Sequence, residues 1–221
     1  MDRLFDLGPI KVVDFADAYS PSHISNAVIH CDSYGIRKID FKPNDVVIDI
    51  GANIGIFSIY LAILHPEITI YSFEPSIVNY EHFLVNIAQN KVTNVQPFNL
   101  ALTDNSRDIW ISVNEDNSGG ACMYAPISGH CNISKSTTLD NFITEKNIDK
   151  VKFLKCDCEG AEYEILKTFK QWGKIEYLSC EIHPNKKDGK RYPKNDLEEL
   201  IKSKLDTKKV IIDTSEVSGL I

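Results

Sequence analysis

Features that would direct the chain to a membrane, a secretory route or a nucleic acid are missing from this 221-residue sequence. No apolar run approaches the roughly 18 residues that a membrane-spanning helix needs. The first residues, 1–6, lack the basic and then apolar order of a signal peptide. Positive charge is scarce, because 24 Lys and Arg stand against 31 Asp and Glu, a net charge of −7. We therefore expect a cytoplasmic protein without a membrane span, and a nucleic-acid partner is disfavoured.

Paired metal-binding or redox cysteines are missing as well. None of the six cysteines forms a C-x-x-C pair, so neither a zinc ribbon nor a thioredoxin-like motif is supported. Cys156 and Cys180 stand inside apolar, strand-like runs, where a reduced thiol acts as a small hydrophobic side chain. We expect reduced thiols in a cytoplasmic enzyme. With 43% apolar and 25% charged residues and no repeat, the composition is that of one globular domain.

The glycine fingerprint of a dinucleotide site is incomplete in this chain. Residues 46–57 nevertheless have the pattern of a cofactor loop, with a short apolar strand, an Asp-x-Gly-x-Asn-x-Gly turn and a helix. Against G-x-G-x-x-G, Asn53 replaces the middle glycine and Ile56 stands at the third. Asp49 would also repel a pyrophosphate. S-adenosylmethionine has no phosphate and carries ammonium and sulfonium charges, so it fits better. Glu74, after the next strand, can accept ribose hydroxyls in either kind of site, so NAD remains an alternative.

Apolar strand patterns alternate with helical ones along most of the chain. This alternation predicts an α/β fold: a doubly wound, mostly parallel Rossmann-like sheet of six or seven strands with helices on both faces. The expected strands are 46–50, 68–73, 95–100, 151–157, 175–181 and 210–212, with 216–221 as a candidate seventh. The expected helices are 53–64, about 76–88, 161–172 and about 193–205.

Two regions depart from this alternation. Residues 1–45 are expected to form an extension that packs on the domain 46–221, with a helix over about 21–31 and a strand over 34–41. Residues 103–137 are too long for a simple loop and contain alternating strand signals at 109–113 and 121–127 around a turn at 117–120. We expect them to form an inserted β-hairpin, or flap, over the sheet edge, followed by a short helix to about 147.

Acidic residues fall at the carboxyl ends of four of the predicted strands. Because parallel strands end on one rim, where ligands bind in such sheets, these acids should converge there. They are Asp49, Glu74, Asp157 and Glu181. This convergence is hard to explain by sheet stability alone.

A series of motifs supports a more specific assignment. They occur in the order Val47–Gly55 (VIDIGANIG), Phe73–Ser76 (FEPS), Asn99–Asp104 (NLALTD), Thr138–Asp140 (TLD) and Lys155–Glu162 (KCDCEGAE). Together they resemble the FkbM-type family of S-adenosylmethionine-dependent methyltransferases, which have the class I Rossmann-like fold. The resemblance covers roughly residues 45–183, and its last motif is the most diagnostic. It implies methyl transfer to a hydroxyl of a small-molecule, sugar or lipid-linked acceptor.

Candidate roles follow from the positions of these motifs. The expected cofactor-binding residues are Asp49, Gly51, Ala52, Asn53, Gly55, Glu74, Pro75, Ser76, Ala101 and Asp157. Glu74 would hold the ribose and Pro75 and Ser76 would lie near the adenine, where Ala101 offers only its backbone. O-methylation requires removal of the acceptor's proton, for which the candidate catalytic residues are Asp157, Glu159 and His183. Asp157, Glu159 and Glu181 are candidate ligands for Mg²⁺, which prefers oxygen donors.

Other interpretations remain open for several of these features. The chain could be a nicotinamide-dependent oxidoreductase, or a non-catalytic cofactor-binding module of the same fold. His183, before Pro184, could simply cap a strand end, and Glu162 could serve the N-terminal dipole of a helix. Lys155 could neutralise Asp157 or point to solvent. The basic loop 186–191 could be solvated or could contact an anionic acceptor.

Overall fold

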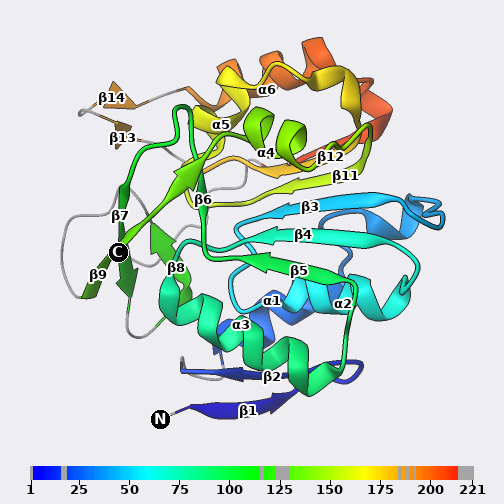
Figure 1. Ribbon diagram of the computed structural model, residues 1–221, viewed down its shortest axis with the longest axis vertical. Coiled ribbons are helices and arrows are strands. Elements are labelled where there is room, and N and C mark those ends of the chain that lie inside the picture. Colours follow the sequence, from blue (N-terminus) through cyan, green and yellow to red (C-terminus); the bar gives the residue numbers. More distant parts are fainter. Residues whose placement is uncertain are drawn as a thin grey trace.

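The computed structural model describes residues 2–15, 19–114, 117–122, 130–183, 186–187, 190–191 and 193–213. Its central sheet has the order β15-β12-β11-β3-β4-β5, and every neighbouring pair is parallel (Figure 1). The strands are β3 (Val46–Ile50), β4 (Thr69–Phe73), β5 (Val95–Phe98), β11 (Val151–Cys156), β12 (Ile175–Glu181) and β15 (Val210–Asp213). The doubly wound, Rossmann-like α/β prediction is confirmed, with six strands. The candidate seventh strand lies outside the described residues.

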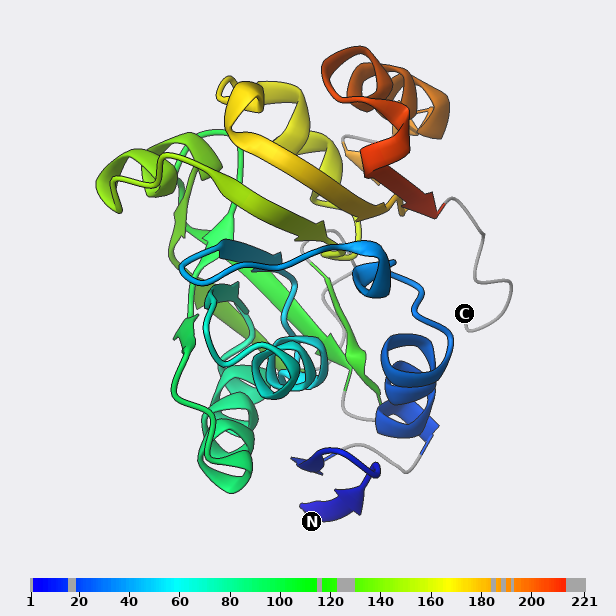
Figure 2. The same ribbon diagram turned by 90° about the vertical axis from the view of Figure 1, so that its right-hand side faces the viewer.

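Helices cover both faces of this sheet, as predicted (Figure 1, Figure 2). One face carries α1 (Tyr19–Ser25), α2 (Ile56–Leu64) and α3 (Ile77–Asn90), and the other carries α4 (Leu139–Glu145), α5 (Glu162–Thr168) and α6 (Lys194–Lys204). Short 3-10 helices span Ile36–Lys38, Trp172–Lys174 and Thr207–Lys209. Each face has its own apolar core, as expected for a parallel sheet buried on both sides. Within the described ranges, every helix is too short or too polar to cross a membrane.

Helix α2 begins later than the sequence pattern indicates. The pattern predicts a helix from residue 53, but Asn53 and Gly55 have φ angles of +53° and +91°, which a right-handed helix excludes. The helix therefore starts at Ile56. α5 ends at Thr168 rather than near 172 because Phe169 has an extended backbone, with ψ of 132°.

The segment before β3 belongs to the same apolar core as the sheet. β1 (Arg3–Asp6) and β2 (Lys11–Asp14) form an antiparallel hairpin, and α1 continues as a π-helix over Asn26–His30. The predicted helix is thus present, but the predicted strand 34–41 is wrong. Gly35 has a left-handed φ of +68°, and its N–H donates to the Asp32 carbonyl at 2.8 Å, which closes a turn. The 3-10 helix Ile36–Lys38 follows this turn, so the segment cannot be an extended strand.

The insertion is a three-stranded antiparallel sheet in the order β8-β7-β9. The predicted inserted β-structure is therefore present, with one strand more than a hairpin. Its strands are β7 (Ile109–Asn114), β8 (Asn117–Cys122) and β9 (His130–Ser134). The turn predicted at 117–120 is wrong, because those residues pair with β7 as β8. The predicted strand 121–127 overlaps β8 only at its start, and residues 123–127 lie outside the described part of the chain. Figure 1 places this small sheet beside the carboxyl ends of β3, β4 and β5.

Short strand pairs complete the architecture. β6 (Ala101–Leu102) pairs in parallel with β10 (Ser136–Thr137), which anchors both ends of the insertion to each other. The strand predicted over 95–100 is therefore split, since β5 ends at Phe98 and the chain turns before β6. β13 (Lys186–Lys187) and β14 (Lys190–Arg191) form an antiparallel pair after β12.

Candidate active site

The loop after β3 approaches two neighbouring segments very closely. The backbone N–H groups of Gly51 and Ala52 donate to the carbonyl at the end of β4, at 3.0 and 2.9 Å. Gly51 has a φ of +80°, and a Cβ there would lie 1.8 Å from the Asp157 carbonyl oxygen. At Gly55, with a φ of +91°, a Cβ would lie 2.1 Å from the Phe83 ring. Packing alone therefore requires both glycines, whatever ligand the loop holds.

Glu74, predicted to hold a ribose, is buried at the end of β4 and is fixed by backbone donors. Its Oε2 accepts from the Asn53 N–H at 2.8 Å and its Oε1 accepts from the Ser76 N–H at 2.9 Å. Burial raises the pKa of Glu74 to about 7, although these hydrogen bonds oppose the shift. Ser76 also caps α3, because its hydroxyl accepts from the Asn79 N–H at 3.4 Å. The carboxylate is thus oriented by the loop that precedes α2.

An apolar pocket opens between the loop after β3 and the inserted sheet. Gly51, Pro75 and Ala101, all predicted to contact the cofactor, lie on its walls. Ile109 and Ile111 of β7 line it as well, so the insertion forms one side. The remaining lining residues are Ile50, Phe73, Leu100, Leu102, Cys158 and Ala161. Such a lining, without charged side chains, suits a flat heteroaromatic ring such as adenine.

A buried lysine connects this loop with the end of β11. Lys155 is opposite Asp49 in the parallel register, and its Nζ lies 3.1 Å from Asp49 Oδ1. The same ammonium donates to the Gly51 carbonyl at 3.1 Å and lies 3.6 Å from Asp157 Oδ2. Burial disfavours its charge, but the carboxylates of Asp49 and Asp157 outweigh that penalty, so the pKa of Lys155 lies well above its usual range. Lys155 therefore pairs with both acids and does not point to solvent.

Asp49 is completely buried beneath the loop. Its Oδ2 accepts from the Ser58 hydroxyl of α2 at 2.6 Å, and that hydroxyl lies 2.7 Å from the Ser72 hydroxyl of β4. With Lys155 on its other oxygen, the carboxylate is surrounded by protein groups. Asp49 therefore shapes the loop from below, and any effect it has on a cationic ligand is exerted through charge.

Asp157, after β11, receives a contact from the N-terminal segment. The Tyr34 hydroxyl donates to Asp157 Oδ2 at 2.6 Å, on the oxygen that also faces Lys155. The Asp157 side chain remains 19% exposed at the rim. Burial and the neighbouring carboxylate raise the pKa of Tyr34 well above its usual value, so the phenol stays protonated and donates.

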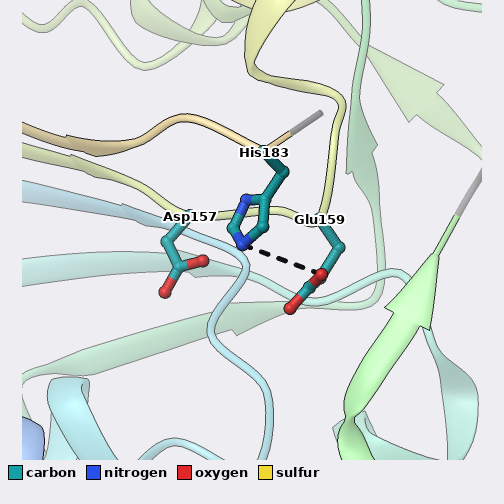
Figure 3. A group of neighbouring side chains, drawn as sticks. All are labelled: Asp157, Glu159 and His183. Carbon is teal, nitrogen blue, oxygen red and sulfur yellow. Dashed lines mark ion pairs between the residues drawn. The ribbon is translucent and has the colours of Figure 1, made fainter. Parts of the chain in front are cut away.

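His183 lies beside the carboxylates of Asp157 and Glu159, and its imidazole forms an ion pair with Glu159 (Figure 3). Its Nδ1 is 3.0 Å from Glu162 Oε1, and its Nε2 is 3.7 Å from Glu159 Oε2 and 3.5 Å from Glu181 Oε1. Burial disfavours the charge, but hydrogen bonds with Glu162 and Glu181 outweigh this and raise the pKa of His183 to about 12. The imidazole is then protonated at neutral pH and has no lone pair to accept a proton.

Glu159 and Glu162 have different surroundings. The buried Glu162 accepts from the backbone N–H groups of Cys158 and Gly160, at 2.9 and 3.2 Å, so it holds the loop at the start of α5 together. Glu159 has a left-handed φ of +55°, which is strained for a side chain of its size, and its side chain is 40% exposed. Burial of its carboxyl raises the pKa of Glu159 to about 7, near that of a base working at neutral pH.

The predicted metal ligands are brought together only in part. Among the described residues, the group whose ligand atoms all lie within 4.8 Å consists of Asp157, Glu159 and His183, so His183 takes the place predicted for Glu181. This set of two carboxylates and one imidazole fits Mg²⁺ poorly, because Mg²⁺ prefers octahedral coordination by oxygen atoms. The imidazolium itself supplies the positive charge among these carboxylates.

Three residues of this site were not predicted as functional. Lys155 carried a signal, since a lysine inside an apolar strand must find a partner when both faces of the sheet are covered. For Glu162 the sequence leaves open a role at the helix dipole or in function, and the structure adds its hydrogen bonds to the loop and to His183. Tyr34 gave no signal, because it lies 123 positions from Asp157 in the sequence.

Comparison with known proteins identifies the family. A sequence model described as the methyltransferase FkbM domain matches residues 49–206. The chain belongs to the FkbM methyltransferase family. It is an S-adenosylmethionine-dependent methyltransferase with the Rossmann-like fold of that class. Methyltransferase 1 of Beauveria bassiana is 25% identical over 170 residues, which cover 67% of this chain and 68% of that protein.

Other similarities cover shorter or more distant regions. The 31-O-demethyl-FK506 methyltransferase FkbM of Streptomyces tacrolimicus is 37% identical over 54 residues, 24% of this chain and 21% of that protein. Among solved structures, Trm5b of Pyrococcus abyssi aligns with a TM-score of 0.46 and 16% identity over 91% of this chain and 46% of that chain. The chain thus spans about half of the length of that solved protein. The family assignment rests on the family model.

Proposed function

We propose that this methyltransferase transfers the methyl group to a hydroxyl oxygen of a small-molecule, sugar or lipid-linked acceptor. The observation that carries the proposal is the pair of partly exposed carboxylates, Asp157 and Glu159, at the carboxyl end of β11 beside the cofactor loop. An alcohol must lose its proton as its oxygen is methylated, which requires a base at this place. The pKa of Glu159, raised to about 7, suits that task. The name of the Streptomyces relative, which specifies an O-demethyl compound, is consistent with an oxygen acceptor.

The residues proposed to hold the cofactor surround the loop after β3. Backbone groups of Gly51, Ala52, Asn53 and Gly55 would approach it, and Asp49 would contribute negative charge from below. Glu74 would accept the ribose hydroxyls, and Pro75, Ser76 and Ala101 would bound the adenine pocket that Ile109 and Ile111 close. When bound, S-adenosylmethionine supplies an electrophilic methyl group on a sulfonium. The inserted sheet would exclude water and orient the acceptor, which contributes much of the rate in such a reaction.

Asp157 and Glu159 divide the chemical work in this proposal. Asp157 is held by Tyr34 and Lys155, so it orients the acceptor hydroxyl by accepting its hydrogen bond. Glu159 takes up the proton and can pass it to solvent, because its side chain is partly exposed at the rim. His183, as the imidazolium, stabilises the carboxylates around it. A metal ion has no step in this scheme, so excess EDTA should leave turnover unchanged. Loss of activity that Mg²⁺ restores would contradict this part.

Cofactor identity is tested by calorimetry of the full chain with S-adenosylhomocysteine and, separately, with NAD. We expect binding of the first and none of the second. Binding of NAD but not S-adenosylhomocysteine would favour the oxidoreductase interpretation.

The reaction is tested with S-adenosylmethionine labelled in its methyl group and a fractionated pool of small molecules, sugars and lipid-linked compounds. Labelled product should form with the wild type, and hydriodic acid should release its label as methyl iodide, as it does from methyl ethers. Asp157→Asn and Glu159→Gln should each abolish or strongly reduce labelling while S-adenosylhomocysteine still binds. Label on nitrogen or carbon would refute an oxygen acceptor, and full activity of both variants would remove these residues from the mechanism.

A further inference from the structure

The side chain of Tyr34 brings the N-terminal segment to the carboxyl end of β11, where the proposed methyl transfer takes place. Tyr34 precedes the central sheet, yet its hydroxyl donates to Asp157 Oδ2 at 2.6 Å. Its ring meets the Phe57 ring edge to face, with centroids 5.2 Å apart, and the Lys155 ammonium lies 5.1 Å from its centre. The ring is thus packed by α2 and by the buried lysine, so the direction of its hydroxyl is fixed.

Both described contacts of the Asp157 carboxylate fall on the same oxygen. Oδ2 takes the Tyr34 hydroxyl and faces Lys155 Nζ at 3.6 Å. In the described part of the chain, Oδ1 receives no hydrogen bond from protein. Lys155 is itself fixed by Asp49 and by the Gly51 carbonyl, at 3.1 Å each. The carboxylate is therefore turned with one oxygen toward the protein and the other left for a ligand.

We propose that Tyr34 is a positioning residue of the methyl-transfer site, which holds Asp157 so that Oδ1 faces the acceptor hydroxyl. This inference rests on the role of Asp157 in the proposed function. Lys155 alone leaves the carboxylate free to rotate, because an ammonium at 3.6 Å attracts either oxygen. The short, directional hydrogen bond from Tyr34 selects one of them. The segment before the sheet is thereby part of the active site.

A purely structural role for Tyr34 makes a different prediction. If only its ring matters, Tyr34→Phe should behave as the wild type, because that variant keeps the contacts with Phe57 and Lys155. If the hydroxyl positions Asp157, the variant should retain its fold and cofactor affinity but lose turnover. Tyr177→Phe is the matched control, since Tyr177 also packs on this face of the sheet and contacts lysines through its ring.

The first measurement does not depend on the acceptor. Crystals of the wild type and of Tyr34→Phe, each with S-adenosylhomocysteine, are compared at high resolution. We expect one Asp157 conformer in the wild type and in Tyr177→Phe, and a rotated or split carboxylate in Tyr34→Phe. An Asp157 conformer that is unchanged in Tyr34→Phe would overturn the proposal.

The second measurement is methyl transfer to the acceptor fraction found with labelled cofactor. We expect kcat of Tyr34→Phe to fall on the order of 10- to 100-fold, with KM for S-adenosylmethionine unchanged, as for a misplaced reacting group. A normal kcat in Tyr34→Phe alongside an inactive Asp157→Asn would refute positioning and leave the proposed function intact. A normal kcat in Asp157→Asn would instead remove the function on which this inference rests.

Discussion

Glu74 combines two properties that make cofactor binding depend on pH. It is buried and its pKa is raised to about 7, yet a ribose-binding carboxylate accepts hydrogen bonds best when ionised. Binding would then lower the pKa of Glu74, so the complex releases a proton when it forms below pH 7. Because the free protein holds that proton more tightly than the complex does, affinity falls as the pH drops below about 7 and levels off above it.

We predict that the affinity for S-adenosylhomocysteine weakens by up to about tenfold per pH unit below pH 7. Calorimetry at several pH values, in buffers of different ionisation enthalpy, measures both the affinity and the proton released. Glu74→Gln should bind more weakly but without this pH dependence. A wild-type affinity that is constant between pH 6 and 8 would contradict the role of Glu74.

Lys155 should contribute strongly to stability, because it compensates a fully buried carboxylate. Removing one partner of a buried ion pair typically costs about 3–5 kcal/mol, whereas neutralising both partners costs much less. Lys155→Met should therefore lower the free energy of unfolding by about that amount, as measured by urea denaturation. The double variant Lys155→Met with Asp49→Asn should recover much of the loss, since asparagine can still accept from Ser58. Equal stability of the two variants would show that the pair is not coupled.

At the scale of elements, sequence patterns predicted best the strands of the central sheet, which are buried on both faces. The central strands carry apolar side chains into the cores on both faces of the sheet, and the order of strands and helices along the chain was predicted with small errors at the ends. The errors fall where the backbone angle of a single residue determines where an element begins or whether it forms. Asn53 has a φ of +53° and delays α2, and Gly35 has a φ of +68° and replaces a predicted strand by a turn. Apolar periodicity carries no information about such angles.

In the candidate site as well, some features could be predicted from the sequence and others depend on the fold. Asp49, Glu74 and Asp157 could be placed at one rim because parallel strands end together. The pairings of Lys155 and the contact from Tyr34 depend on side-chain packing between distant segments, which one sequence does not reveal. The sequence predicts His183 as a site residue, but its charge state depends on carboxylates from α5 and β12 that only the fold brings to it.

Element packing also explains how the N-terminal hairpin is attached. Asn86 of α3 acts like part of a neighbouring strand: its side chain accepts from the Val13 N–H at 2.6 Å and donates to the Val13 carbonyl at 3.1 Å. The same amide donates to the Ile54 carbonyl in the cofactor loop at 2.9 Å. Asn90, one turn later, makes the equivalent pair of bonds with Lys11, at 2.9 and 2.6 Å, in a more exposed place.

We predict that Asn86→Ala loosens β2 and costs roughly 1–3 kcal/mol of stability, because it leaves buried backbone groups without partners. Hydrogen exchange at the Val13 amide should become much faster in this variant. Asn90→Ala is the matched control and should have a smaller effect, since water can reach the Lys11 backbone. Identical exchange at Val13 in the wild type and Asn86→Ala would show that the hairpin is held by other contacts.

At the scale of the whole molecule, the boundary near residue 45 does not divide two cores. The family model begins at residue 49, which suggests that the preceding segment is dispensable. The apolar core on the α2 face contradicts that suggestion, because the N-terminal segment supplies a large share of it: Ile10, Val12, Val28, Ile29, Ile36, Ile39 and Phe41 are buried there with Val47 and Phe57. Removing these side chains would expose the face of β3 and α2 that they cover.

We therefore predict that a chain lacking residues 1–44 loses its cooperative fold instead of merely losing activity. Burying a side chain such as isoleucine or phenylalanine contributes about 1.5–3 kcal/mol, so the seven together contribute about 10–20 kcal/mol, as much as the roughly 5–15 kcal/mol by which typical domains are stable. Near-UV circular dichroism, dye binding and thermal unfolding of the truncated chain measure this directly. A shorter deletion, of residues 1–9, is the matched control and should stay folded, because it leaves this set of buried side chains in place. A truncated chain that unfolds cooperatively and binds S-adenosylhomocysteine would show that the segment is a separable extension.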